Sequence, residues 1–196
     1  MLQNVEHAEL LRKKTSEFYN ISMEGCQPGK DYPVMGILNR HSNSSRVILN
    51  VEQLKQQVAK MTDRPVKVEY FEDKDFYQQI TYMMQTDIII SPHGAQLTSI
   101  NFMPTCGGVF EAFPPGYWYP HFFGPLAASS GLFHGYVYTG ANLKKEWIKG
   151  GLKNKKLRNA ARELDICIPL ETALTQIGQL VDNWKSCCHN QLNSHG

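Results

Sequence analysis

The sequence predicts an α/β protein: a Rossmann-like parallel sheet with helices on both faces, spanning residues 33–140. Two observations predict this class. Short apolar or alternating segments, typical of strands, take turns along the chain with segments whose apolar residues recur at helical spacing. The chain also has 196 residues, of which 42% are hydrophobic, which suffices for a sizeable core. Strands that alternate with helices favour a parallel sheet with right-handed crossovers.

The strands are expected in five segments, which are residues 34–38, 66–70, 87–91, 108–113 and 133–138. Residues 87–91, with three consecutive isoleucines, are typical of a strand buried on both faces. Between them, helices are expected at residues 50–60, 75–84, 94–101 and 119–130. Asn50 with Gln53, and Asp75 with Gln78, have the spacing of a capping box.

Three segments flank this domain. Residues 1–32 are expected to form an N-terminal helix and a linker, and residues 170–188 an amphipathic helix packed on the domain. Residues 141–169 form a basic loop, interpreted as a solvated loop or helix face, with a phosphate- or membrane-facing patch as the alternative. Its cations are Lys144, Lys145, Lys149, Lys153, Lys155, Lys156, Arg158 and Arg162.

The charge balance argues against a nucleic-acid partner, because the chain has 20 Lys and Arg and almost as many Asp and Glu, 18. No run approaches the roughly 18 apolar residues of a membrane span. The first residues lack a basic region followed by an apolar block, so the chain is expected to carry neither a signal nor a transmembrane segment.

The five cysteines match no zinc or thioredoxin spacing. Their count is odd, so at least one thiol is free in a monomer. We expect scattered core or surface thiols. A disulfide from Cys167 to Cys187 or Cys188 is the alternative in an oxidising compartment.

The chemistry is expected where the strand at residues 87–91 ends and a helix begins at His93-Gly94-Ala95. Ligands of parallel sheets bind at the carboxyl ends of strands. A helix start adds unpaired N–H groups and partial positive charge. Gly94 and Ala95 leave room for a close approach, so the turn suits a diphosphate. The alternative for His93 is a structural imidazole bonded to its own turn.

Two further residues are expected at the same edge. Arg40 ends the first strand and can pair with phosphate oxygens, unless it is an ordinary surface arginine. Glu111 follows His93 by 18 residues, near the spacing at which dinucleotide folds place a ribose-binding acid. Its alternative is a capping or salt-bridged acid. Together these residues predict a nucleotide-diphosphate site.

Residues 37–40 (Ile-Leu-Asn-Arg), 87–99 and 109–114 (Val-Phe-Glu-Ala-Phe-Pro) resemble glycosyltransferase family 61, and the resemblance covers residues 33–140. The family commonly shows His-Gly-Ala-Gly-Leu-Thr-Asn. Here Gln96 replaces the second glycine and Ser99 the asparagine. Gln96 is expected either to crowd a diphosphate or to add a hydrogen bond to it.

The resemblance implies one lobe of a GT-B glycosyltransferase that transfers a sugar with inversion from a nucleotide-sugar, usually a UDP-sugar, to a protein or polysaccharide acceptor. It implies no obligatory metal and no cofactor besides the donor substrate. It also implies work in the lumen of the Golgi or endoplasmic reticulum, and a second, N-terminal lobe that residues 1–32 are too short to supply. The catalytic base stays unidentified, with His93 as candidate. On the family pattern, the donor is bound by Arg40, His93, Gly94, Ala95, Gln96, Leu97, Thr98 and Glu111.

Other interpretations remain open. Asp73 and Asp75 have the Asp-x-Asp spacing of a divalent-metal site, although a turn with Asp75 as N-cap explains them more simply. His121 and His134 are too isolated to predict a metal site. Trp118 or Tyr119 stacks on a base or sugar, or simply packs under its loop.

Two other function classes compete with the transferase. A nicotinamide-dependent oxidoreductase suits the fold, but no Gly-x-Gly-x-x-Gly follows a strand. A non-catalytic nucleotide- or carbohydrate-binding module is the other.

Overall fold

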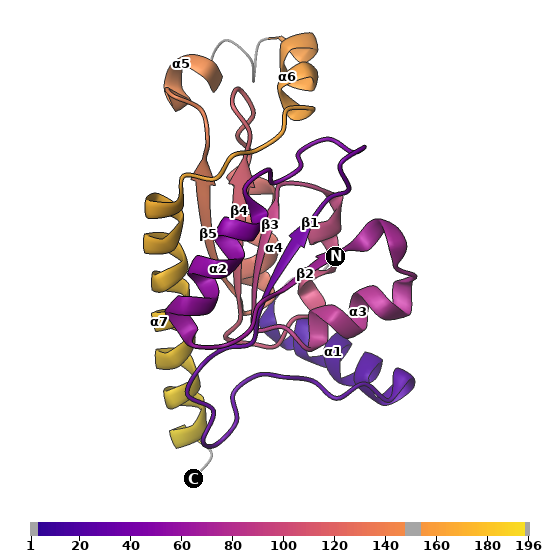
Figure 1. Ribbon diagram of the computed structural model, residues 1–196. Coiled ribbons are helices and arrows are strands. Elements are labelled where there is room, and N and C mark those ends of the chain that lie inside the picture. Colours follow the sequence, from indigo (N-terminus) through magenta and orange to yellow (C-terminus); the bar gives the residue numbers. More distant parts are fainter. Residues whose placement is uncertain (1–3, 148–153, 195–196) are drawn as a thin grey trace.

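The structure, a computed structural model, describes residues 4–147 and 154–194 and is built on five parallel strands (Figure 1). Their order in the sheet is β2-β1-β3-β4-β5. The fold prediction is confirmed, and each strand lies within one residue of its expected ends. The strands are β1 (Met35–Asn39), β2 (Lys67–Tyr70), β3 (Ile88–Pro92), β4 (Gly108–Phe113) and β5 (Phe133–Tyr138).

Helices cover both faces of the sheet, because alternate side chains of each strand point to opposite sides. Ile88 and Ile90 share a core with α2 (Val51–Thr62) and α7 (Leu170–Ser194). Ile89 shares the other core with three elements: α3 (Phe76–Met84), the short helix η2 (Ala95–Phe102) and α4 (Pro120–Ser129). On that side α1 (Val5–Tyr19) packs against η2 and α4 (Figure 1). In the described part of the chain, no helix has the length and apolar composition of a membrane span.

One predicted capping box is confirmed and the other is wrong. The Asp75 carboxylate accepts from the N–H of Gln78 at 2.8 Å, and the Gln78 side chain accepts from the N–H of Asp75 at 3.0 Å. The side chain of Asn50 makes no capping bond to α2. Its amide instead donates to the carbonyl of Ile168 at 2.8 Å and accepts from the N–H of that residue at 2.9 Å. Asn50 therefore tethers the segment that leads into α7.

The helix expected at residues 94–101 exists as η2, a 3₁₀-helix. Its first turn closes with the N–H of Leu97 on the carbonyl of Gly94 at 3.0 Å. The tighter winding points Leu97 and Ile100 into the core. The N–H groups of Ala95 and Gln96 precede this first bond, so they are not used within the helix.

The cysteine pairing differs from both expectations. Cys26 is bonded to Cys188, and Cys106 to Cys187. Cys167 is exposed and free, so the disulfide expected from it is wrong, as is the expectation of mainly free thiols. The neighbouring cysteines of α7 thus tie its C-terminal part to two segments 162 and 81 residues away along the chain.

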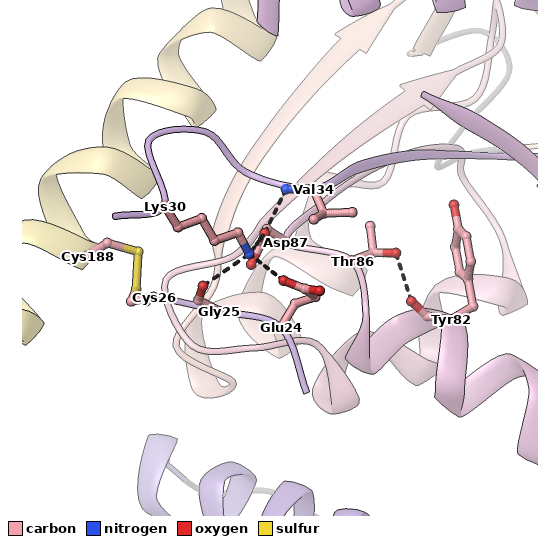
Figure 2. A network of polar contacts seen from close by, with 9 residues as sticks. All are labelled: Glu24, Gly25, Cys26, Lys30, Val34, Tyr82, Thr86, Asp87 and Cys188. Carbon is pink, nitrogen blue, oxygen red and sulfur yellow. Dashed lines mark hydrogen bonds and ion pairs between the residues drawn. A yellow bond between two sulfur atoms is a disulfide. The ribbon is translucent and has the colours of Figure 1, made fainter. Parts of the chain in front are cut away.

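A buried ion pair lies beside the Cys26–Cys188 disulfide (Figure 2). The ammonium of Lys30 donates to Asp87 and to Glu24, at 2.7 Å each. Burial raises the pKa of the Asp87 carboxyl, against the lowering effect of Lys30 and of the Val34 N–H. Because Asp87 directly precedes β3, this network fixes the residue 24–34 segment at the amino edge of the sheet.

The basic segment lies at the other edge. It contains α5 (Leu143–Trp147) and α6 (Lys155–Arg162), and both lie beyond the carboxyl ends of β4 and β5 (Figure 1). Its cations Lys149 and Lys153 lie outside the described residues.

Candidate functional site

The strand order places a topological switch point between β1 and β3. From β1 the chain passes outward to β2 on one side, and from β3 it continues through β4 and β5 on the other. In open α/β sheets the crevice at such a point, outside the carboxyl ends of the strands, is where ligands bind. Arg40 directly follows β1 and His93 directly follows β3. The fold therefore brings these two predicted residues together at the carboxyl edge of the sheet, beside the switch point.

Gly94 lies directly under two guanidinium groups. A Cβ placed on Gly94 would lie 2.4 Å from Nη2 of Arg40 and 3.3 Å from Nη1 of Arg46. The backbone of Gly94 is extended, with a φ of 164°, so any residue could adopt its conformation. Glycine is needed here for space, because a side chain would push the Arg40 guanidinium away from the turn.

Arg46 is a site residue that the sequence reasoning missed. Its Nη1 donates to the carbonyl oxygen of His93 at 2.8 Å, and the residue is only 7% exposed. Its backbone is left-handed, with a φ of 63°, which folds the side chain back over the His93 turn. No motif marks it, since it follows a polar loop of ordinary composition.

The two arginines are neighbouring positive charges that the carboxylate of Glu163 offsets only through space. Burial and, to a smaller extent, the positive charge of the neighbouring Arg40 lower the pKa of Arg46 to about 10. Burial also lowers the pKa of Arg40. Both Nε atoms are buried without a hydrogen-bond partner, and neither guanidinium forms an ion pair within the described residues. Two desolvated like charges side by side are unfavourable, so a bound anion would stabilise the arrangement.

His93 is held by a buried carboxylate. Its Nδ1 shares a short hydrogen bond with Oε1 of Glu111, and its Nε2 lies 3.2 Å from the hydroxyl of Tyr117. The other carboxylate oxygen, Oε2, bonds Nε2 of His134 at 3.0 Å. Glu111 is fully buried, so it takes the salt-bridged position that was the alternative for it. Ribose binding by Glu111 stays a prediction, and one that requires rearrangement.

Tyr117 and His134 were not predicted as part of this site. The register pairs Glu111 with Tyr136 and Val109 with His134, so His134 is a diagonal neighbour of Glu111. This contact can be recognised only when the register between β4 and β5 is known. Tyr117 lies in the aromatic loop after β4. In that loop the sequence indicated its neighbours, Trp118 and Tyr119, as candidates for stacking on a ligand. Trp118 packs on Trp147, with ring centroids 5.8 Å apart.

The remaining predicted residues lie along η2, and not all of them face the two arginines. Leu97 is buried in the core, whereas Ala95 and Thr98 are exposed. The Gln96 amide donates to the Ser91 hydroxyl at 2.7 Å. The structure thus joins Arg40, His93 and Gly94 tightly. Ala95 and Gln96 contribute mainly their backbone N–H groups as donors to a ligand.

Helix α6 brings further cations to the same region. Arg158 donates to the hydroxyl of Tyr119 at 3.4 Å. The positive charges of Arg162, Arg46 and Arg158 favour the ionised form of Tyr117, but burial has the larger effect and its pKa is raised. The basic segment therefore contributes arginines to the site, which fits the phosphate-facing alternative better than a purely solvated face.

The Asp-x-Asp residues have separate partners. Asp75 caps α3, and the exposed carboxylate of Asp73 bonds Nε2 of His41 at 2.7 Å. This arrangement matches the interpretation as a turn and an N-cap.

A parallel sheet with arginines over a glycine turn at its switch point is typical of α/β proteins that bind phosphorylated ligands. The chain matches the family model Glycosyltransferase 61 over residues 3–110, and it belongs to that family.

Two curated relatives illustrate the similarity. Mouse protein O-linked-mannose beta-1,4-N-acetylglucosaminyltransferase 2 is 27% identical over 161 residues, which are 76% of this chain and 27% of the relative. Mouse EGF domain-specific O-linked N-acetylglucosamine transferase is 32% identical over 96 residues, which are 48% of this chain and 18% of the relative. The chain spans about a quarter of the length of the first relatives it matches, at 27%.

Proposed function

We propose that this chain is the donor-binding lobe of a family-61 glycosyltransferase, and that it holds the diphosphate of a UDP-sugar at the switch point. The observation that carries the proposal is the pair Arg40 and Arg46. Both guanidinium groups lie over the His93-Gly94-Ala95 turn, with buried Nε atoms and no ion-pair partner within the described residues. A diphosphate supplies the missing negative charge, and its oxygens suit bidentate pairing with guanidinium.

The same groups suit the chemistry of sugar transfer. When the bond between sugar and diphosphate breaks, negative charge develops on the leaving UDP. Fixed guanidinium and backbone N–H donors at that position stabilise the transition state. On this proposal the arginines take the place of a metal ion, and transfer proceeds with inversion to a protein or polysaccharide acceptor held with a second lobe. Both relatives are named as N-acetylglucosamine transferases, so UDP-N-acetylglucosamine is the first donor to test.

We place the protein in the secretory pathway lumen on the same proposal. Disulfides form and persist in oxidising compartments, and this fold carries two of them.

The test is a calorimetric titration with UDP, UDP-N-acetylglucosamine, UDP-xylose, GDP and NAD, each with and without a chelator. We expect UDP ligands to bind equally well in chelator. Arg40→Ala and Arg46→Ala should each weaken binding by about 10- to 150-fold, the equivalent of the roughly 1.5–3 kcal/mol of a hydrogen bond to a charged group. Arg64→Ala is the matched control, because this exposed arginine lies at the amino edge of the sheet.

Other outcomes would contradict the proposal in distinct ways. Binding of NAD alone would identify a nicotinamide-dependent oxidoreductase. Loss of UDP binding in chelator would assign a metal to Asp73 and Asp75. UDP binding that is unchanged by both arginine substitutions would place the donor elsewhere.

A further inference from the structure

We propose that Asn20 is a site of N-linked glycosylation, and that the exposed ring of Phe18 packs against the first sugar of this glycan. The two residues lie at the end of α1, outside the donor site described above. The proposal rests on one part of the proposed function, the placement of the chain in the secretory pathway lumen, because N-linked glycans are attached to secreted proteins.

Two triplets in the sequence have the form Asn-x-Ser that accepts an N-linked glycan, at residues 20–22 and 43–45. Such triplets also occur by chance, so the structural surroundings must distinguish them. The second triplet lies in the loop between Arg40 and Arg46, where a bulky glycan would crowd the residues proposed to hold the diphosphate. The first triplet carries the proposal.

The side chains that the modification requires are accessible in the first triplet. Asn20 and Ser22 are both exposed. Between them, Ile21 is 4% exposed and packs in a cluster with Ile80 and Met84. Within the described residues, the Asn20 amide and the Ser22 hydroxyl form no hydrogen bond. The buried Ile21 therefore fixes the segment, while the two polar side chains remain available to a modifying enzyme.

The end of α1 holds the backbone of this triplet. The N–H groups of Asn20 and Ile21 both donate to the carbonyl of Ser16, the second at 3.1 Å. Asn20 is left-handed, with a φ of 53°, which is a common conformation for an asparagine that ends a helix. The capping position accounts for Asn20. It accounts neither for the exposed hydroxyl of Ser22 nor for the aromatic ring that precedes Asn20 by two residues.

Phe18 has the largest exposure among the large hydrophobic side chains of the described residues, at 81%. Its ring meets Tyr19 edge-on with centroids 4.8 Å apart, and Tyr19 lies 5.5 Å from Tyr77. A surface hollow of about 550 Å³ adjoins Phe18 and Tyr19. Neighbouring aromatic rings that remain exposed are typical of a surface that another group covers.

A sugar on Asn20 would begin two residues from the Phe18 ring. The face of an aromatic ring is apolar and carries partial negative charge, so it attracts the weakly positive C–H groups on one face of a pyranose ring. The hydroxyl groups of the sugar stay in water in this arrangement. The first N-acetylglucosamine of an N-linked glycan therefore fits both the attachment point and the exposed ring.

The modification exchanges one bond of Asn20 for another. Nδ2 loses a proton and forms a bond to C1 of the first N-acetylglucosamine. The co-reactant is an oligosaccharide joined through a diphosphate to a membrane lipid. Its bond between C1 and the phosphate oxygen breaks, and the diphospholipid leaves. The surface at the end of α1 gains bulk and polar groups but no charge.

The first test identifies the modified residue. The chain is produced behind a secretion signal in cultured animal cells, treated with a peptide N-glycosidase, which converts a glycosylated asparagine to aspartate, and digested with trypsin. The two triplets fall on separate peptides, residues 15–30 and 41–46, each with one asparagine. We expect the conversion at Asn20. Ser22→Ala should abolish it, and Ser22→Thr should preserve it, because threonine supplies the same hydroxyl.

The second test measures the contact with Phe18. An endoglycosidase leaves a single N-acetylglucosamine on Asn20, and the peptide N-glycosidase leaves none. We expect a higher urea midpoint with the single sugar, because the sugar covers the exposed ring, and no such difference in Phe18→Ala. Phe76→Ala is the matched control and should keep the full difference, since Phe76 is also exposed and contacts Phe102. The conversion to aspartate is the same in all three proteins, so it cancels in the comparison.

The outcomes separate the two proposals. A secreted chain whose peptide 15–30 contains only unconverted asparagine would overturn the glycosylation of Asn20. A midpoint difference that persists in Phe18→Ala, or is missing in the chain with Phe18, would overturn the role of the ring. UDP titrations are made on the same preparations. A chain that binds UDP with Asn20 unmodified overturns the glycosylation alone, and a glycosylated chain that does not bind UDP overturns the donor site alone.

Discussion

At the scale of single residues, Gly94 decides whether two guanidinium groups fit over the turn after β3. Gly94→Ala would place a methyl group 2.4 Å from Nη2 of Arg40. That atom ends a flexible side chain, so the guanidinium moves and the fold persists. We expect UDP affinity to fall at least about tenfold, as for loss of a charged hydrogen bond, with little change in unfolding free energy. Calorimetry and urea unfolding measure the two quantities.

Gly178→Ala is the control for this substitution. Gly178 lies within α7, and a Cβ there meets nothing within 4 Å. The change should raise the unfolding free energy by about 0.5–1 kcal/mol, because glycine loses more chain entropy in a helix than alanine. UDP affinity should stay the same. If Gly94→Ala also left affinity unchanged, Arg40 would not be the phosphate ligand.

The site was predictable from sequence where strand ends define it. Arg40 and His93 follow buried strands, and the carboxyl ends of parallel strands share one edge. Arg46 was not predictable, because its role depends on a left-handed backbone and on the carbonyl of a residue 47 positions away. Glu111 was expected at the same edge and bonds His93 there, but its bond to His134 of the adjacent strand depends on the strand register.

At the scale of elements, the capping box of α3 gives a direct test. Asp75→Ala removes the acceptor for the N–H of Gln78, and we expect it to lower the unfolding free energy by about 1 kcal/mol. Asp73→Ala is the matched control. The Asp73 side chain is 69% exposed and, in the described part of the chain, pairs with His41, so its loss should cost at most about 0.5 kcal/mol. Equal losses in urea unfolding would contradict the assignment of Asp75 as the cap.

The helix starts also show the limit of predicting a cap from local sequence. Asp75 and Asn50 have equivalent spacing to a glutamine, yet only Asp75 caps its helix. The Asn50 side chain is occupied by the backbone of Ile168, 118 residues away, and a local pattern contains no information on that partner. In η2 the expected helical segment is present, and it is wound as a 3₁₀-helix with Leu97 and Ile100 in the core.

At the scale of the whole molecule, the two edges of the sheet have separate tasks. The carboxyl edge carries the arginines and His93. The amino edge carries the Lys30–Asp87 pair and the Cys26–Cys188 disulfide (Figure 2). The Cys106–Cys187 disulfide also binds α7 to the body. Sequence could not reveal the second arrangement, because the cysteines that pair are 162 and 81 residues apart and no local spacing marks either pair.

This division predicts that reduction affects stability and leaves ligand binding intact. Reducing Cys26–Cys188 and Cys106–Cys187 releases constraints on long loops of the unfolded chain, and loss of one such bond typically costs about 2–5 kcal/mol. We expect the urea midpoint to fall markedly in reductant, while UDP affinity of the folded fraction stays the same. Cys167→Ser is the control, since that thiol is exposed and free, and it should match the unmodified chain in both conditions. An unchanged midpoint in reductant would show that α7 is held by its apolar face alone, and a parallel loss of UDP affinity would show that the two edges are not independent.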